Sequence, residues 1–175
     1  CMTDLIIVAA GKGSRLSGAG NLPKALVPII NGESSVVRTV RFARNYRSIF
    51  VVTNQLRQEE WVPFFSAFPS ATNIPISSGL GDGHAVLEAG KYCWRHDFEI
   101  SPKTVVCWGD VFFRNDRLLD EMLTNTYDNA IIPAQLETNP YVTLLVDDEL
   151  NCVGADFSKH GETHKRGFHD QSIFG

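Results

Sequence analysis

The stretch that decides the fold runs from an apolar block into glycines flanked by cations: Ile6-Ile7-Val8-Ala9-Ala10-Gly11-Lys12-Gly13-Ser14-Arg15-Leu16. The apolar block suits a short buried strand, and the small residues after it let backbone N–H groups approach an anion. A dinucleotide-binding fingerprint requires a third glycine where Leu16 stands, and a Walker loop requires the order Gly-Lys-Ser/Thr, so neither loop fits. The stretch therefore predicts either another kind of phosphate loop, with Arg15 adding positive charge, or a tight turn.

The composition limits the classes of protein to which the chain can belong. It has 175 residues, 43% of them apolar, which is enough for one domain with a buried core. Its 16 basic and 20 acidic residues give a net charge of −4, which predicts no nucleic-acid and no anionic-membrane surface. The four cysteines are scattered and fit no disulfide framework or metal spacing. Because the opening apolar run is too short for a signal peptide or a membrane span, we expect a cytoplasmic enzyme or binding domain.

Strand-like and helix-like segments alternate along the first two thirds of the chain, a pattern that builds a parallel sheet covered on both faces. Continuous apolar runs predict buried strands and helical spacing predicts helices. The predicted strands are residues 5–9, 49–53 and 104–108, and the predicted helices are residues 35–45, 84–95 and about 116–125. Ser34 or Ser35 is expected to cap the first helix and Asn115 the last. Pro63 is expected to break any helix that starts near Asn54.

The last third of the chain has a more antiparallel character. Residues 130–134 and 142–146 read as strands, and residues 147–151 read as a polar turn that leads into a further strand at 152–155. The sequence therefore predicts a single α/β domain over residues 1–175. Its expected fold is Rossmann-like, a three-layer α/β/α arrangement with a mixed, mostly parallel sheet.

Three polar clusters follow predicted strands, and open α/β sheets bind their ligands beyond the carboxyl ends of the strands. The first cluster is the opening loop together with Lys24, whose backbone is restrained by the prolines on either side of it. The second is Ser78-Gly79-Leu80-Gly81-Asp82-Gly83-His84-Ala85, directly before a predicted helix. The third is Gly109-Asp110, where a carboxylate suits Mg²⁺.

Each cluster also has a simpler interpretation when it is taken alone. Lys24 is then an ordinary surface lysine, and Asp110 is a turn residue that ends a strand. The glycine-rich segment is then a flexible loop in which Asp82 caps the helix. The occurrence of all three clusters in this order on one chain favours the functional interpretation.

Read in order, these motifs closely resemble the nucleotidyltransferase family that includes the sugar-phosphate nucleotidylyltransferases and the MobA-like NTP transferases. The opening signature of that family is Ala-Ala-Gly-x-Gly-x-Arg-Leu followed by Pro-Lys, and every element is present between Ala9 and Lys24. The segment from Gly81 resembles the base-and-ribose loop of the N-acetylglucosamine-1-phosphate uridylyltransferases, which usually has threonine where Asp82 stands. Gly109-Asp110 matches the metal-binding Gly-Asp of the family. The resemblance is good over about the first 110 residues and thins beyond them.

The resemblance implies an NTP-binding part over about residues 1–112 and an acceptor-binding part over about residues 113–175. It implies catalytic roles for Arg15, Lys24 and Asp110, with Mg²⁺ as cofactor and Asp110 as its ligand. The residues that it implies for nucleotide binding are Ala9, Ala10, Gly11, Gly13, Ser14, Gly81 and Asp82.

The reaction that the resemblance implies is of the EC 2.7.7 type, as in the biosynthesis of nucleotide sugars. A phosphate oxygen of a small acceptor, such as a sugar 1-phosphate or phosphocholine, attacks the α-phosphorus of an NTP and pyrophosphate leaves. Catalysis of such a step is mostly positioning and charge neutralisation. Arg15 would then clamp the β- and γ-phosphates, and Lys24 would bridge the α-phosphate and the acceptor phosphate.

The sequence departs from the family in its last third. A second metal ligand has no clear equivalent, and Asp170 is the nearest candidate. His160, His164 and His169 read as a solvated polar segment, as contacts to the acceptor phosphate or as a metal site. Two explanations therefore stay open: a compact member of the family, or a fragment without its acceptor site. The alternative to an enzyme is a nucleotide-binding regulatory or interaction module without turnover.

Overall fold

The computed structural model of the chain describes residues 2–11, 22–77, 81–124, 130–138, 140, 142–157 and 166–175. The strands are β1 (Thr3–Ala9), β2 (Pro28–Ile30), β3 (Glu33–Ser34), β4 (Ser48–Asn54), β5 (Ala71–Ile76), β6 (Lys103–Trp108), β7 (Ala134–Thr138), β8 (Val142–Val146), β9 (Cys152–Phe157), β10 (Arg166–Asp170) and β11 (Ile173–Phe174). The α-helices are α1 (Ser35–Phe42), α2 (Gln58–Ala67), α3 (Asp82–Arg95) and α4 (Arg117–Thr124), and the short 3₁₀ helices are η1 (Lys24–Leu26) and η2 (Gln55–Arg57).

The chain forms two compact units, Cys1–Tyr127 with Gly175, and Asp128–Phe174. The single domain over residues 1–175, with its NTP-binding part ending near residue 112, stays a prediction. Each unit is described below by itself.

A parallel sheet forms the centre of the first unit, with neighbouring strands in the order β6-β1-β4-β5. The central strand β1 pairs on one side with β4 and on the other with β6, so that Ile7 lies between Val51 and Cys107. All three side chains are fully buried. The continuous apolar runs that predicted these strands therefore reflect a sheet that is covered on both faces.

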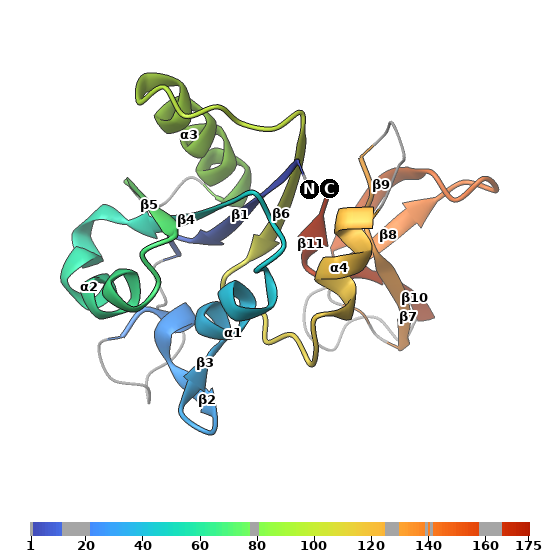
Figure 1. The fold of residues 1–175 in the computed structure, drawn as a ribbon. Coiled ribbons are helices and arrows are strands. Elements are labelled where there is room, and N and C mark those ends of the chain that lie inside the picture. Colours follow the sequence, from blue (N-terminus) through green and yellow to red (C-terminus); the bar gives the residue numbers. More distant parts are fainter. Residues whose placement is uncertain are drawn as a thin grey trace. The chain divides into compact units, whose positions relative to one another are not determined.

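Helices cover both faces of this sheet (Figure 1). On one face, Ile6 and Val8 of β1 pack in a buried cluster with Ala85 and Ala89 of α3. Side chains alternate along a strand, so the fully buried Leu5 points to the opposite face, where α1 and α2 lie (Figure 1). This arrangement confirms the predicted Rossmann-like α/β/α fold with a mixed, mostly parallel sheet.

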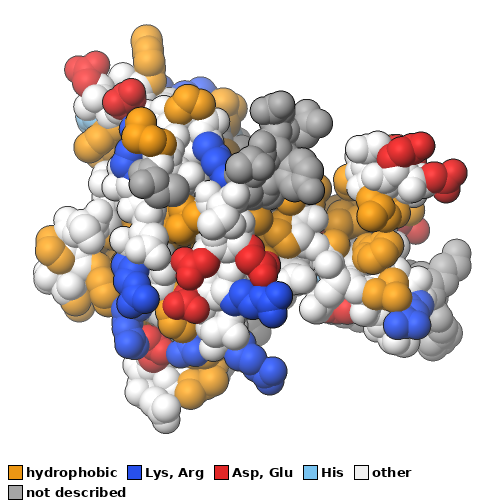
Figure 2. Space-filling model, turned by 45° about the vertical axis from the view of Figure 1, so that its right-hand side comes forward, with side chains coloured by type: hydrophobic (Ala, Val, Ile, Leu, Met, Phe, Trp, Pro, Cys, Tyr) orange, Lys and Arg blue, Asp and Glu red, His pale blue; other side chains and the backbone are white. Residues whose placement is uncertain are grey.

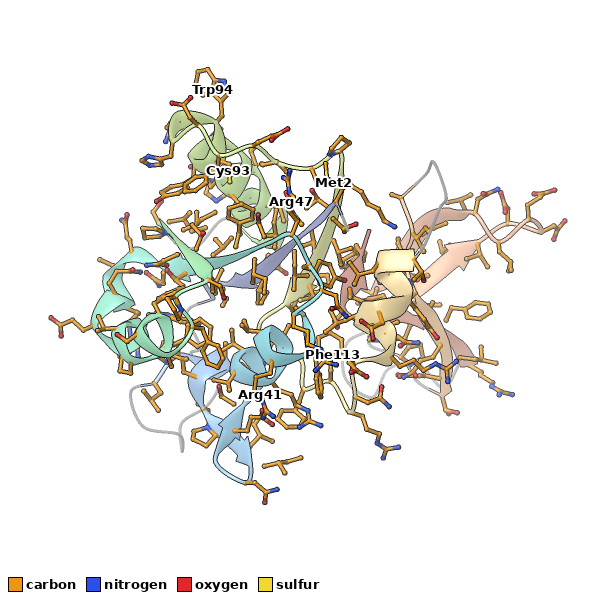
Figure 3. The ribbon with its side chains drawn as sticks, viewed as in Figure 1. Met2, Arg41, Arg47, Cys93, Trp94 and Phe113 are labelled. Carbon is orange, nitrogen blue, oxygen red and sulfur yellow. The ribbon has the colours of Figure 1, made fainter. Side chains whose placement is uncertain are left out.

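A buried ion pair fixes the amino end of the sheet. The carboxylate of Asp4, which is fully buried, accepts hydrogen bonds from Arg47 Nε at 2.9 Å and Arg47 Nη2 at 2.7 Å, and from the backbone N–H of Ser101 at 2.7 Å. Figure 3 shows Arg47 near Met2, where the chain enters β1. The hydrogen bond that Arg47 donates to Asp4 raises the pKa of Arg47, and these bonds compensate the burial of the carboxylate.

The helix α2 shows that the expectation about Pro63 was wrong. Pro63 lies inside α2, and the helix continues to Ala67. A proline at this position removes one helical hydrogen bond, but the aromatic side chains around it anchor the helix. Trp61 is fully buried and Phe64 is 5% exposed, and their rings meet edge to face at 5.5 Å. Tertiary packing therefore outweighs the local preference.

Four strands and a hairpin differ from the sequence prediction. Residues 130–133 are not in a strand, because β7 begins only at Ala134, and β5, β10 and β11 were not predicted. The β2–β3 hairpin was also not predicted, although Asn31 and Gly32 form its two-residue turn with φ of 51° and 76°. Positive φ at both turn residues is what an Asn-Gly pair accepts most readily.

The second unit contains an antiparallel sheet with the strand order β7-β10-β8-β9. The hairpin of β8 and β9 turns at residues 147–151, as predicted. Asp147 holds that turn, because its Oδ1 accepts hydrogen bonds from the backbone N–H groups of Glu149 at 3.1 Å and Asn151 at 2.8 Å. The side-chain hydrogen bond from Asn151 lowers the pKa of Asp147 the most, and the two backbone hydrogen bonds lower it further. The antiparallel character predicted for this part of the chain is confirmed.

The burial of the cysteines generates a labelling prediction. Cys93 and Cys107 are 1% and 0% exposed, and burial raises the pKa of Cys107 to about 12, whereas Cys152 is exposed. Because the thiolate is the reactive species, we expect iodoacetamide near neutral pH to modify Cys152 in the folded protein and to spare Cys93 and Cys107. Peptide mapping by mass spectrometry measures the three sites, with a urea-unfolded sample as the control. Equal labelling of Cys107 and Cys152 without urea would contradict the fold.

Candidate functional site

The candidate site lies at the carboxyl ends of β1 and β6, which are neighbours in the sheet. Val8 pairs with Trp108 in the parallel register, so the chain leaves both strands at the same edge. Beyond this edge β1 continues into Ala10 and Gly11, and β6 continues towards Asp110. Two of the three polar clusters predicted from the sequence therefore meet at one place.

Gly109 allows the two strand ends to approach each other closely. Its backbone N–H donates a hydrogen bond of 2.8 Å to the carbonyl oxygen of Val8. A β-carbon at position 109 would lie 2.8 Å from Cβ of Ala9 and 3.1 Å from the carbonyl oxygen of Val8, which is too close for either contact. The glycine before Asp110 is therefore required by packing.

Lys24 and Asp110 form an ion pair between Nζ and Oδ2, although they lie far apart in the sequence. Their side chains are 53% and 35% exposed. Ion pairs this exposed add little to stability, so the pair is not needed to hold the fold. Two of the three predicted catalytic residues are thus brought together in a position open to a ligand.

The local sequence explains why Lys24 points outwards. Pro23 precedes η1 with φ of −52°, and its carbonyl oxygen accepts a hydrogen bond of 2.8 Å from the N–H of Leu26. Ala25 is 4% exposed and anchors this short helix in the core. With its neighbour buried and its backbone restrained by proline, Lys24 presents its ammonium group at the surface.

The glycine-rich segment reaches the same edge through the amino end of α3. Gly81 precedes α3 with φ of 89°, a left-handed conformation that favours glycine, and Asp82 is the first residue of the helix. The indole Nε1 of Trp108 donates a hydrogen bond of 2.6 Å to Asp82 Oδ2. This hydrogen bond connects the end of β6 to the start of α3. Asp82 therefore makes a tertiary contact as well as starting the helix.

The residues predicted to bind the nucleotide differ in how far they are exposed to solvent. Ala10 is 5% exposed and packs in the cluster beneath α3, so only its backbone is available to a ligand. Ala9 is half-buried, and Gly11 is exposed. Gly13, Ser14 and Arg15 lie outside the described residues.

Asp110 offers Mg²⁺ a carboxylate at this edge. No group of three or more His, Cys, Asp or Glu side chains that could hold a metal occurs within the described residues. Proteins commonly hold Mg²⁺ through one or two carboxylates together with substrate phosphates, and the exposed oxygens of Asp110 fit that mode. Asp110 is therefore a suitable single protein ligand for a metal that arrives with a nucleotide.

The residues considered for the acceptor side lie in the second unit. Asp170 ends β10, and its Oδ1 accepts a hydrogen bond of 2.8 Å from the N–H of Ser172. His169 precedes it in β10, whereas His160 and His164 lie outside the described residues. The role of Asp170 as a second metal ligand stays a prediction.

Sequence reasoning missed two contributions to the site. Ser35 was considered only as a helix cap, yet its hydroxyl donates to the carbonyl oxygen of Gly109 at 2.6 Å. Trp108 was taken only as the end of a strand. Neither role leaves a local signal, because each depends on a partner that is distant in the sequence.

Comparison with known proteins agrees with this arrangement of loops around a parallel sheet, which is typical of nucleotide-binding α/β proteins. The model of the MobA-like NTP transferase domain matches residues 5–162. The chain therefore belongs to the MobA-like NTP transferase domain family, and the resemblance inferred from the motifs is confirmed.

Individual relatives support the same family. The bifunctional protein GlmU of Methanococcus maripaludis strain C7 is 31% identical over 129 residues, which cover 73% of this chain and 28% of that protein. The bifunctional protein GlmU of Coxiella burnetii strain RSA 493 is 29% identical over 172 residues, covering 93% and 34%. A solved structure from Bacillus anthracis, assigned as a glucose-1-phosphate thymidylyltransferase, superposes with a TM-score of 0.77 at 21% identity and covers 98% of this chain and 70% of that one. The chain spans about a third or less of the length of these two curated relatives.

The contact at Gly109 leads to a stability prediction. We expect Gly109→Ala to lower the free energy of unfolding by about 1–3 kcal/mol, because the added methyl group must displace Ala9 or the end of β1. Gly90→Ala is the matched control, since Gly90 lies inside α3 with nothing within 4 Å of its added β-carbon. That variant should gain about 0.5–1 kcal/mol from helix propensity. Urea denaturation followed by circular dichroism measures both, and an unchanged midpoint for Gly109→Ala would refute the close approach.

Proposed function

We propose that the chain is a nucleotidylyltransferase. It transfers a nucleoside monophosphate from an NTP to a phosphorylated small acceptor, such as a sugar 1-phosphate, and releases pyrophosphate. The observation that carries this proposal is the ion pair of Lys24 and Asp110 beside the ends of β1 and β6. Membership of the MobA-like NTP transferase domain family supports the same reaction class.

The proposed step is a displacement at phosphorus. An oxygen of the acceptor phosphate forms a bond to the α-phosphorus of the NTP, and the bond from the α-phosphorus to the bridging oxygen of the β-phosphate breaks. Pyrophosphate leaves with that electron pair. No general base is needed when the acceptor is already a phosphate dianion, so the protein has to place two anions together and neutralise them.

Lys24 and Asp110 supply complementary parts of this task. The ammonium group of Lys24 is exposed, and it would relieve the repulsion between the acceptor phosphate and the α-phosphate. Asp110 would hold Mg²⁺, which when bound neutralises phosphate charge. Arg15 would add its bidentate charge to the β- and γ-phosphates on the basis of the sequence motif.

The surroundings of Asp82 support the placement of the nucleoside near α3. An ionised carboxylate only accepts hydrogen bonds, so Asp82 would bind hydroxyl or amino groups of a nucleoside and repel phosphates. Its orientation is fixed by the indole of Trp108, at 2.6 Å. The phosphates would then lie towards Ala9, Ala10 and Gly11, where backbone groups follow β1.

The surface charges agree with small-molecule substrates. Figure 2 shows Lys and Arg side chains interspersed with Asp and Glu on the visible face, with no broad basic area among the described residues in this view. Among the described residues, no helix is long and apolar enough to span a membrane. We therefore propose an NTP and a phosphorylated acceptor as partners, and a cytoplasmic location as the setting of the reaction.

A pyrophosphate-release assay tests the proposal and its central residue together. The chain is incubated with each of four NTPs, Mg²⁺ and a panel of sugar 1-phosphates and phosphocholine. We expect release with at least one pair, and a loss of about 100-fold in kcat for Lys24→Ala, because one charge-stabilising group is removed. Lys91→Ala is the control, since Lys91 is an exposed lysine paired with Glu88 on α3 and should keep full activity.

The same samples distinguish the two function classes. An enzyme releases pyrophosphate only when an acceptor is present, and Asp110→Asn should lower that release by about 100-fold while leaving it measurable. A regulatory or interaction module would bind an NTP, as measured by calorimetry, without releasing pyrophosphate with any acceptor. That second result would replace the enzyme proposal.

A further inference from the structure

The first residue of α1 carries a buried hydroxyl that no step of the proposed reaction uses. Ser35 is 0% exposed, and its Oγ donates a hydrogen bond of 2.6 Å to the carbonyl oxygen of Gly109. The carbonyl oxygen of Ala25 lies 3.3 Å from the same Oγ. A serine hydroxyl has one hydrogen, so the bond to Gly109 is the stronger one and the contact to Ala25 is secondary.

The two carbonyl groups belong to the neighbours of the ion pair. Ala25 follows Lys24 directly, and Gly109 precedes Asp110 directly. One buried hydroxyl therefore contacts the backbone on both sides of the candidate site. Since the Lys24 and Asp110 side chains are themselves exposed, the separation of their backbones depends on contacts beneath them.

A second residue of α1 holds the chain beyond Asp110. Arg38 lies one helical turn after Ser35, and its Nε and Nη2 donate to the carbonyl oxygens of Phe113 at 2.5 Å and Arg114 at 2.7 Å. Figure 3 shows Phe113 beside α1. Arg38 also donates a hydrogen bond to the carboxylate of Glu33. This bond lowers the pKa of Glu33 and keeps its carboxylate ionised. The segment that carries Asp110 is thus fastened to α1 both before and after the carboxylate.

We propose that Ser35 is a positioning residue that sets the separation of Lys24 and Asp110. This inference rests on the proposed function for its effect on turnover. The positioning itself does not depend on turnover, because it concerns the backbone of the segments that carry Lys24 and Asp110. Ser35 does not touch the substrates; it acts through Gly109 and Ala25.

Two neighbouring side chains in the same helix region provide matched controls. The hydroxyl of Ser34 is buried and has no hydrogen-bond partner among the described residues, so Ser34→Ala removes a similar atom without removing a contact. Thr39 is fully buried, and its Oγ1 donates to the carbonyl oxygen of Ser35 at 2.9 Å within α1. Thr39→Val therefore removes a buried hydrogen bond from the same helix without touching the segments of Lys24 or Asp110.

The kinetic test compares Ser35→Ala with these controls. We expect Ser35→Ala to lower kcat by about 10- to 100-fold with little change in the KM for the NTP, because displacement of catalytic groups by about 1 Å costs this much. Ser34→Ala should match the wild type. Thr39→Val should lower the melting temperature about as much as Ser35→Ala and leave kcat unchanged. Equal losses of kcat in Thr39→Val and Ser35→Ala would contradict the positioning role and show that Ser35 only stabilises the fold.

A double-mutant cycle tests whether Ser35 acts through Asp110. Combined with Asp110→Asn, the change Ser35→Ala should cost far less in kcat than it costs alone, since the group that it positions has already lost its charge. Full additivity of the two losses would contradict the inference. Thr39→Val in the same background provides the comparison.

Crystal structures of the wild type and Ser35→Ala separate this inference from the proposed function. We expect the contact between Lys24 Nζ and Asp110 Oδ2 to be lost or displaced in the variant. An unchanged contact overturns the positioning role, whatever the activity. If the wild type releases no pyrophosphate and the contact is nevertheless displaced, the proposed function fails and the positioning role stands.

Discussion

The hydrogen bond from Gly109 N to Val8 O is the constraint on which the site depends. It holds the end of β6 against the end of β1, and it is possible only because position 109 has no side chain. Two of the segments that form the site begin at this junction. The opening loop leaves from one strand, Asp110 leaves from the other, and Trp108 turns back to meet the start of α3. A parallel sheet thereby converts two distant loops into neighbours.

The ion pair of Lys24 and Asp110 has a different character from the buried ion pair of Asp4 and Arg47. The carboxylate of Asp4 at the opposite edge is buried and bound by three donors, which is typical of a structural role. Lys24 and Asp110 are exposed and form an ion pair with each other within the described part of the chain. A pair of this kind exchanges partners at little cost when a phosphate or a cation arrives. The amino end of the sheet thus holds a buried ion pair, and its carboxyl end an exposed one.

The sequence predicted the elements whose signals are local. The buried strands β1, β4 and β6, the helices α1, α3 and α4, and the turn at Asp147 follow from apolar runs, helical spacing and turn chemistry. The clusters of Lys24 and Asp110 were expected at the ligand-binding end of the sheet from the predicted strands, and the resemblance to a family implied that both residues act in one site. The continuation of α2 through Pro63 and the bond from Ser35 to Gly109 were not predictable, because tertiary packing and long-range partners decide them.

The central place of β1 also has a consequence for the order of folding. β1 pairs with β4 in a register that places Asp4 opposite Ser48, but its other neighbour pairs Thr3 with the much more distant Lys103. Closing so long a loop is entropically costly and slow compared with local helix formation. We therefore expect β1 and β4, with α1, to associate before β6 docks, so that the two strand ends of the site come together only at that later step.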